Sequence, residues 1–286
     1  NSDSKYPEYL ENSDGLIHFF ELADKGENAK HSIVSVSSHN SISYITFQYA
    51  DGTMYYINAA TTWDEEGKFT LSDPYKMEMM DWGMTYNGYF YYQIYPLDRH
   101  WDACMSIRLE PIDIELYDLY AEYLAPVGYP SSVFTLDWDK SNYEDICFND
   151  LFEALYRERY DDYVYTDNYE YYSDMQCSLI PAEIFENTIL PYFEIPLDEF
   201  RVSTLYMRES NTYPWQTLNC SNIIYCPTLI PEVVERRDNE DGTFTIVVDV
   251  LCFDYKCFPM FTHEITIRPN GDDGFHYVRS EEHTSE

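Results

Sequence analysis

The chain has 286 residues, a length that fits one large domain or two of ordinary size. Its 52 acidic side chains against 17 basic ones give a formal net charge of −35. Such a surface repels phosphate backbones and anionic lipids, so we expect no nucleic-acid partner. Because 45% of the residues are apolar, as in ordinary globular proteins, the charge indicates a solvated surface and not a disordered chain.

No run of about 18 apolar residues occurs, so no transmembrane segment is predicted. The chain begins at Asn1 and not at Met, as a mature exported protein or a fragment would.

The first third of the chain reads as short strands rich in Tyr, Ile, Phe and Thr, residues that suit a pleated, half-buried surface. Asp51-Gly52 and Asn87-Gly88 supply the residues of positive φ that two-residue hairpin loops need. The pattern predicts an antiparallel meander over residues 14 to 110. Its strands are expected at residues 16–22, 32–37, 43–50, 54–63, 82–86, 89–95 and 104–109.

Beyond Pro111 the apolar spacing changes to a helical one, which predicts a helix over residues 112–123. A second helix is expected over 141–156, because Ser141 and Glu144 have capping-box spacing. The Tyr- and Asp-rich stretch 160–174 lacks a clean period and is expected to be a surface loop. Pro181 and Pro196 each fit the start of a further helix.

The last third returns to strands, with a turn at residues 238–242. These strands are predicted at residues 223–225, 232–236, 244–252, 260–268 and 275–278. An N-terminal meander, then helices, then a curved antiparallel sheet is an α+β order, and by analogy it resembles the cystatin or NTF2 half-cone. We expect two domains, residues 1–128 and 131–278, divided at the Gly- and Pro-containing stretch between them.

Residues 279–286 form a charged tail that matches the translation of a common sequencing adapter. We therefore expect the native sequence to be truncated after Val278, and we assign the tail no function.

The familiar catalytic motifs are absent, and no catalytic residue, metal ligand or cofactor is predicted. His263-Glu264 begins like a zinc-binding helix, but Ile267 stands where the second histidine is required. Two further sets have ligand-like spacing but incomplete patterns: His100, Asp102 and Cys104 for a transition metal, and Asp137, Asp139 and Ser141 for calcium. A polar strand end and a turn are the simpler interpretations.

Seven cysteines leave at least one unpaired within the chain. Cys252 and Cys257 flank a four-residue loop and could lie across a hairpin from each other, which makes them candidates for a disulfide in an oxidising compartment. Cys220 and Cys226 are a looser candidate pair.

Several segments together resemble a family of uncharacterised bacterial proteins, predicted lipoproteins of Gram-positive gut anaerobes that carry a domain of unknown function. The segments are DWGMT at 81–85, VGY at 127–129, IPAEIFEN at 180–187, YFEI at 192–195, YPW at 213–215, DGTFT at 241–245, FTHEITIR at 261–268 and YV at 277–278. The resemblance implies export and a lipid anchor on an N-terminal cysteine outside this chain. It implies no activity and no catalytic residues.

Three functions follow as hypotheses. The leading one is a non-catalytic, extracytoplasmic protein, secreted or anchored at the cell surface, that binds a glycan or a protein. The second is a carbohydrate-active hydrolase with a carboxylate pair that 52 acids conceal. The third is a structural spacer at the cell surface. The tryptophans at positions 63, 82, 101, 138 and 215 would line a sugar-binding face or anchor the core.

Overall fold

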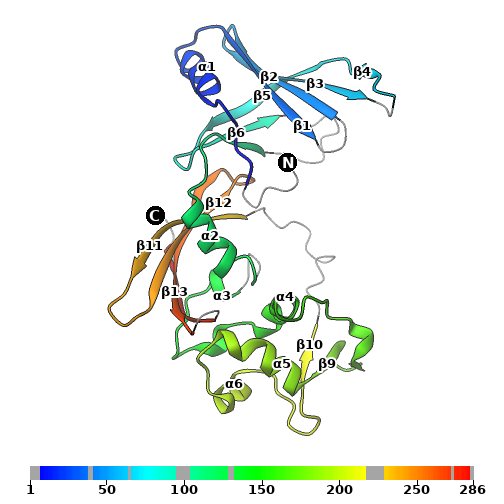
Figure 1. Ribbon diagram of the computed structural model, residues 1–286, viewed down its shortest axis with the longest axis vertical. Coiled ribbons are helices and arrows are strands. Elements are labelled where there is room, and N and C mark those ends of the chain that lie inside the picture. The colour runs from blue at the N-terminus through cyan, green and yellow to red at the C-terminus, as the bar shows by residue number, and fades with distance from the viewer. Residues whose placement is uncertain are drawn as a thin grey trace. The chain divides into compact units, whose positions relative to one another are not determined.

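The computed structural model describes residues 7–37, 41–63, 66–94, 104–127, 132–216, 229–271 and 274–283 (Figure 1). The chain forms two compact units. The first comprises Asn1–Ile112 with Phe253–Lys256, and the second comprises Asp113–Cys252 with Cys257–Glu286. Each unit has its own buried apolar cluster.

The first unit is built on an antiparallel sheet whose strands follow one another in the order β1-β2-β3-β5-β6-β7, with β4 paired to β3. This order is the predicted meander. The strands are β1 (Ala29–Ser37), β2 (Ser41–Ala50), β3 (Thr53–Trp63), β4 (Phe69–Leu71), β5 (Tyr75–Met84), β6 (Tyr89–Ile94) and β7 (Cys104–Arg108).

The two predicted hairpin turns differ in outcome. Asp51 and Gly52 both have positive φ and join β2 to β3 in a two-residue loop, as predicted. The turn between β5 and β6 is longer, because Thr85 N donates to Tyr89 O and Gly88 N donates to Thr85 O. Four residues therefore separate these strands, and the prediction of a two-residue loop at Asn87-Gly88 was wrong.

Residues 16–22 form a helix and not the predicted strand. Helix α1 (Asp14–Asp24) buries four side chains, Leu16, Phe19, Phe20 and Ala23, whose spacing places them on one helical face. Phe20 packs in the centre of the first core, with its ring centroid 4.1 Å from that of Phe90 and 5.4 Å from that of Trp82. Burial of this apolar stripe outweighs the strand propensity of the phenylalanines.

The second unit contains the helices of the middle of the chain. They are α2 (Ile114–Tyr123), α3 (Ser132–Thr135), η1 (Tyr143–Asp145), α4 (Phe148–Tyr160), η2 (Thr166–Asn168), α5 (Ala182–Ile189), η3 (Leu190–Tyr192) and α6 (Leu197–Ser203). The starts of α5 and α6 after Pro181 and Pro196 agree with the predictions.

Two predictions in this region were wrong in detail. The helix expected from residue 141 begins at Phe148, because Asp139 accepts hydrogen bonds from the backbone N and Oγ of Ser141 and closes a turn there. The stretch 160–174 is more ordered than a loop, since it contains η2 and the strand β8 (Glu170–Tyr172). Strand β8 pairs with β9 (Cys177–Pro181), which pairs with β10 (Thr212–Trp215).

A four-stranded antiparallel sheet completes the second unit, in the order β11-β12-β13-β14. Its strands are β11 (Leu229–Asp238), β12 (Phe244–Cys252), β13 (Cys257–Pro269) and β14 (Phe275–His283). The register shifts at three points, and such bulges increase the curl of a sheet. Helices α2 and α3 lie beside the curved strands (Figure 1). The predicted strand 223–225 lies outside the described residues.

The α+β architecture is confirmed: an antiparallel meander, then helices, then a curved antiparallel sheet. The expected domains place residues 112–123 with the first domain, whereas α2 belongs to the second unit. Tyr277 Oη on β14 donates to Tyr123 O at the end of α2, and the rings of Tyr123 and Phe244 lie 5.3 Å apart. Part of the expected boundary, residues 128–131, lies outside the described residues.

The tail residues Arg279 to His283 pair with β13 as the second half of β14. Ser280 is buried and exchanges backbone hydrogen bonds with Trp138. The adapter origin of the tail stays a prediction, which a genomic contig spanning these codons would test.

A candidate binding groove in the second unit

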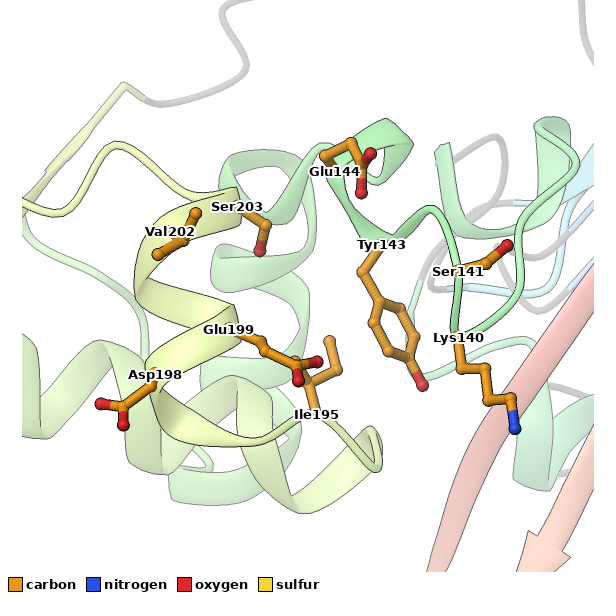
Figure 2. Close-up of a pocket in the computed structure, with 9 residues that line it drawn as sticks. All are labelled: Lys140, Ser141, Tyr143, Glu144, Ile195, Asp198, Glu199, Val202 and Ser203. Carbon is orange, nitrogen blue, oxygen red and sulfur yellow. The ribbon is translucent and has the colours of Figure 1, made fainter.

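An open groove of about 570 Å³ lies between η1 and α6 in the second unit (Figure 2). Its lining combines three carboxylates, one ammonium group, hydroxyl groups and two aliphatic side chains. The lining residues are Lys140, Ser141, Tyr143, Glu144, Ile195, Asp198, Glu199, Val202 and Ser203.

Asparagine and aspartate side chains hold the wall that carries Lys140 and Ser141. The Asp139 carboxylate closes a turn by accepting from Ser141, and these hydrogen bonds lower the pKa of Asp139. Asn142 donates to Asp137 O and to Asp145 Oδ2, and it accepts from the Asp139 backbone N. Hydrogen bonds within the chain therefore join the Asp139 carboxylate and the Ser141 hydroxyl group, which belong to the residues whose spacing suggested a calcium loop.

Helix α6 forms the opposite wall and is fixed from beneath. Phe200 is fully buried, with its ring 5.0 Å from that of Phe148. Arg201 donates to both carboxylate oxygens of Glu186, at 2.7 and 3.1 Å, and Tyr213 Oη donates to Glu186 at 2.9 Å. With its buried side secured, α6 presents its acidic first turn and Val202 to the solvent, and the acids suit the positive end of the helix dipole.

The floor of the groove is made by Ile195 and the ring of Tyr143, each only 7% exposed. Glu194, next to Ile195, forms an ion pair with Arg268 on β13 and lies 3.4 Å from Nδ1 of His276 on β14, which fixes this part of the floor to the sheet. The hydrogen bond from Arg268 lowers the pKa of Glu194. Burial raises the pKa of Tyr143, and nearby negative charge adds to this effect, so its phenol is a hydrogen-bond donor at neutral pH.

The groove suits a ligand that is both cationic and apolar. Glu144, Asp198 and Glu199 are exposed, with Lys140 as the one basic side chain of the lining. Val202 is 86% exposed, so an aliphatic side chain is accessible at the groove. In Figure 2, Glu199 and Tyr143 extend toward the space between the two walls, whereas Asp198 points away from it.

The other residues singled out in the sequence lie elsewhere. The register pairs Cys252 directly with Cys257. Asp241 accepts from the backbone and hydroxyl of Thr243 in the β11–β12 turn, as expected for a hairpin. Trp138 and Trp215 are 2% and 1% exposed, and Trp138 Nε1 donates to Val133 O, so both are core residues. His100, Asp102, Trp101, Cys220 and Cys226 lie outside the described residues.

One group with metal-ligand chemistry was not predicted. Ligand atoms of Glu264, Glu281 and His283 lie within 4.8 Å of one another on β13 and β14. Arg237 is 2.6 Å from Glu264 and Arg279 is 3.3 Å from Glu281, so side chains of the protein already supply positive charge to both carboxylates.

Within the described residues, no helix is long and apolar enough to span a membrane.

The sequence model of a family of unknown function, DUF6070, matches residues 2–285. The chain belongs to this family. No curated protein and no solved structure matches it. DUF6070 carries no assigned activity, so the chemistry of the groove has to be argued from its residues.

The groove itself was not predicted from the sequence. Its walls come from segments far apart in the chain, and the sequence signals noted at each wall, a calcium-like spacing and a proline, indicated local structure only. The adjacent acids Asp198 and Glu199 after Pro196 were the one sequence signal in this wall that pointed to a charged surface.

Proposed function

We propose that this DUF6070 protein is a non-catalytic binding protein that acts outside the cytoplasm. We further propose that its groove takes a basic, apolar segment of a partner protein. The observation that carries the proposal is the lining: the exposed carboxylates of Glu144 and Glu199, with Asp198 at the edge, beside one lysine and the exposed Val202 in one open groove. A net charge of −35 would steer a cationic partner toward this surface.

The lining favours a peptide over a glycan. Sugar recognition relies on an exposed aromatic face, and the one aromatic ring in the groove, Tyr143, is 93% covered. Val202, by contrast, offers an aliphatic contact for a Leu, Val or Met side chain, and Glu144 and Glu199 offer carboxylates to Lys or Arg.

The hydrolase hypothesis rests on the same carboxylates but has less support. A glycosidase needs a general acid whose apolar surroundings keep it protonated. Glu144, Asp198 and Glu199 are all exposed to solvent. Turnover of a glycoside that is abolished by Glu199→Gln or Glu144→Gln would establish the hydrolase and overturn the binding proposal.

A peptide array probed with the purified chain tests the proposal directly. We expect peptides with two or more Lys or Arg residues next to aliphatic ones to bind, and their charge-reversed versions to stay silent. The double variant Glu144→Lys/Glu199→Lys should weaken binding of the best peptide by about tenfold or more, which corresponds to about 1.4 kcal/mol, as measured by titration calorimetry.

Glu183→Lys serves as a matched control. Glu183 is an exposed acid in the first turn of α5, outside the groove lining, so its reversal changes net charge equally per site. Equal weakening by Glu183→Lys and by Glu199→Lys would reduce the effect to overall charge and contradict a site in the groove. An array silent for basic peptides and glycans alike would contradict the binding function.

The proposed location rests on the resemblance to exported proteins noted in the sequence. Protease treatment of intact cells that express the natural gene tests it. Digestion of the protein while a cytoplasmic marker survives is the expected result, and protection of both would contradict it.

A further inference from the structure

The tip of the β12–β13 hairpin carries two cysteines in facing positions. Cys252 is the last residue of β12, Cys257 is the first of β13, and the two are paired residues in the antiparallel register. Between them, the turn Phe253–Lys256 is closed by a hydrogen bond from Lys256 N to Phe253 O. Strand β11 pairs with the other side of β12 through Leu229 and Cys252. The position of Cys252 is therefore set from both sides.

This placement meets the geometric requirement for a disulfide. Directly opposed residues of an antiparallel pair have Cα atoms about 4.5 to 5.5 Å apart, and their side chains lie on the same face of the sheet. Disulfides span Cα separations of about 4.4 to 6.8 Å. Cys252 and Cys257 are paired just beyond a register shift that follows Val250, at the strand ends next to the turn.

The two sulfurs differ in access. Cys252 is 0% exposed, whereas Cys257 is partly exposed. Thiol–disulfide exchange proceeds through a mixed disulfide, and the attacking thiolate has to reach the incoming disulfide. Only Cys257 offers that access, so the two cysteines have different roles in the exchange.

We propose that Cys252 and Cys257 form an ordered dithiol site that a disulfide-bearing molecule, such as glutathione disulfide or a thiol oxidoreductase, converts to a cross-strand disulfide. The thiolate of Cys257 attacks the carrier disulfide, releases one carrier thiolate and forms a mixed disulfide. The thiolate of Cys252 then attacks the sulfur of Cys257, forms the intramolecular bond and releases the second carrier thiolate. The two protein thiols lose two protons and two electrons, and the carrier disulfide is reduced to two thiols.

The bond would tie together the two ends of a loop with defined contacts. Within the first unit, the Phe253 ring lies 5.4 Å from that of Tyr89, and Lys256 forms an ion pair with Asp81. The disulfide would therefore restrict the loop that carries these two contacts.

Peptide mapping tests the bond in the unmodified protein, because trypsin cleaves after Lys256, between the two cysteines. After treatment with oxidised glutathione and blocking of remaining thiols, we expect peptides 238–256 and 257–279 to remain joined until a reductant is added. Recovery of both peptides separately, each carrying the blocking group or a glutathionyl group, would overturn the proposal.

Single variants test the order of attack. Cys252→Ser should accumulate the mass of one glutathionyl group on peptide 257–279, because the resolving thiol is missing. Cys257→Ser should leave Cys252 thiol-bearing after the same treatment. Labelling of the exposed Cys147 in both variants verifies that the reagent is active. Equal glutathionylation at Cys252 and at Cys257, with both variants folded by circular dichroism, would contradict the assigned roles.

Discussion

His263 is a titratable side chain inside an apolar core. It is 0% exposed on β13, and its ring lies 6.2 Å from that of Phe134 and 5.9 Å from that of Phe261. Burial lowers the pKa of this imidazole from 6.5 to about 4, although the negative charge of Asp249 acts in the opposite direction. The folded state therefore holds His263 neutral.

A pH-dependent loss of stability follows from this burial. Between pH 6.5 and 4 the unfolded chain binds a proton at His263 that the folded chain does not bind. The contribution of neutral His263 is therefore complete above pH 6.5 and is lost as the pH falls to 4. The difference between a pKa of 6.5 in the unfolded chain and about 4 in the folded chain corresponds to about 3 kcal/mol in the free energy of unfolding. Urea denaturation of the natural chain and of His263→Phe, from about pH 7.5 to about pH 4.5, measures it.

His263→Phe should show a weaker fall in the free energy of unfolding over this window, because the titrating group is gone and the cavity stays filled. Identical pH profiles for the natural chain and His263→Phe would contradict a buried neutral histidine.

At the scale of single elements, α1 fills the core of the first unit. Phe20 contacts Phe47, Phe90 and Trp82 at ring distances of 6.3, 4.1 and 5.4 Å. We expect Phe20→Ala to lower the free energy of unfolding of the first unit by about 3 to 5 kcal/mol, through lost burial and the cavity left behind. Hydrogen exchange at increasing denaturant concentration, followed for the amides of each unit in turn, measures the free energy of unfolding of the first unit apart from that of the second.

The exposed Glu21 of the same helix is the matched position, and Glu21→Ala should change the free energy of unfolding by less than about 0.5 kcal/mol. An equal effect of the two substitutions would show that α1 does not depend on its buried face.

Local chemistry explains which elements the sequence predicts well. The β2–β3 turn follows from two adjacent residues, because Asp51 and Gly52 tolerate the positive φ that the turn requires. Helix α1 was missed although its buried positions have a helical period, since a short apolar run with two phenylalanines also suits a strand. The start of α4 was missed because Asp139, and not a helix N-terminus, binds Ser141.

Local sequence signals do not predict the groove. The position of Val202 in one wall depends on the packing of Phe200 beneath α6, and the position of Ile195 in the floor depends on the ion pair between its neighbour Glu194 and Arg268. None of these contacts joins neighbours in the sequence. The opposition of Cys252 and Cys257 was predictable, because a short loop between two strands sets the register by itself.

At the scale of the whole molecule, the charge of −35 opposes the compact state by self-repulsion. Salt at about 0.5 M shortens the Debye length to a few ångströms and screens this repulsion. We therefore expect the midpoint of thermal unfolding to rise as sodium chloride is added at neutral pH, as measured by calorimetry. Tetramethylammonium chloride should produce the same rise if screening is the cause. A midpoint that is independent of both salts would contradict it.

The central position of strand β12 limits how its amide protons exchange with solvent. All nine of its residues are buried, and both of its edges are hydrogen-bonded, to β11 and to β13. Its amide protons can therefore exchange with solvent only when the sheet opens as a whole. The slowest-exchanging amides of β12 thus measure the free energy of opening of this sheet directly, without denaturant.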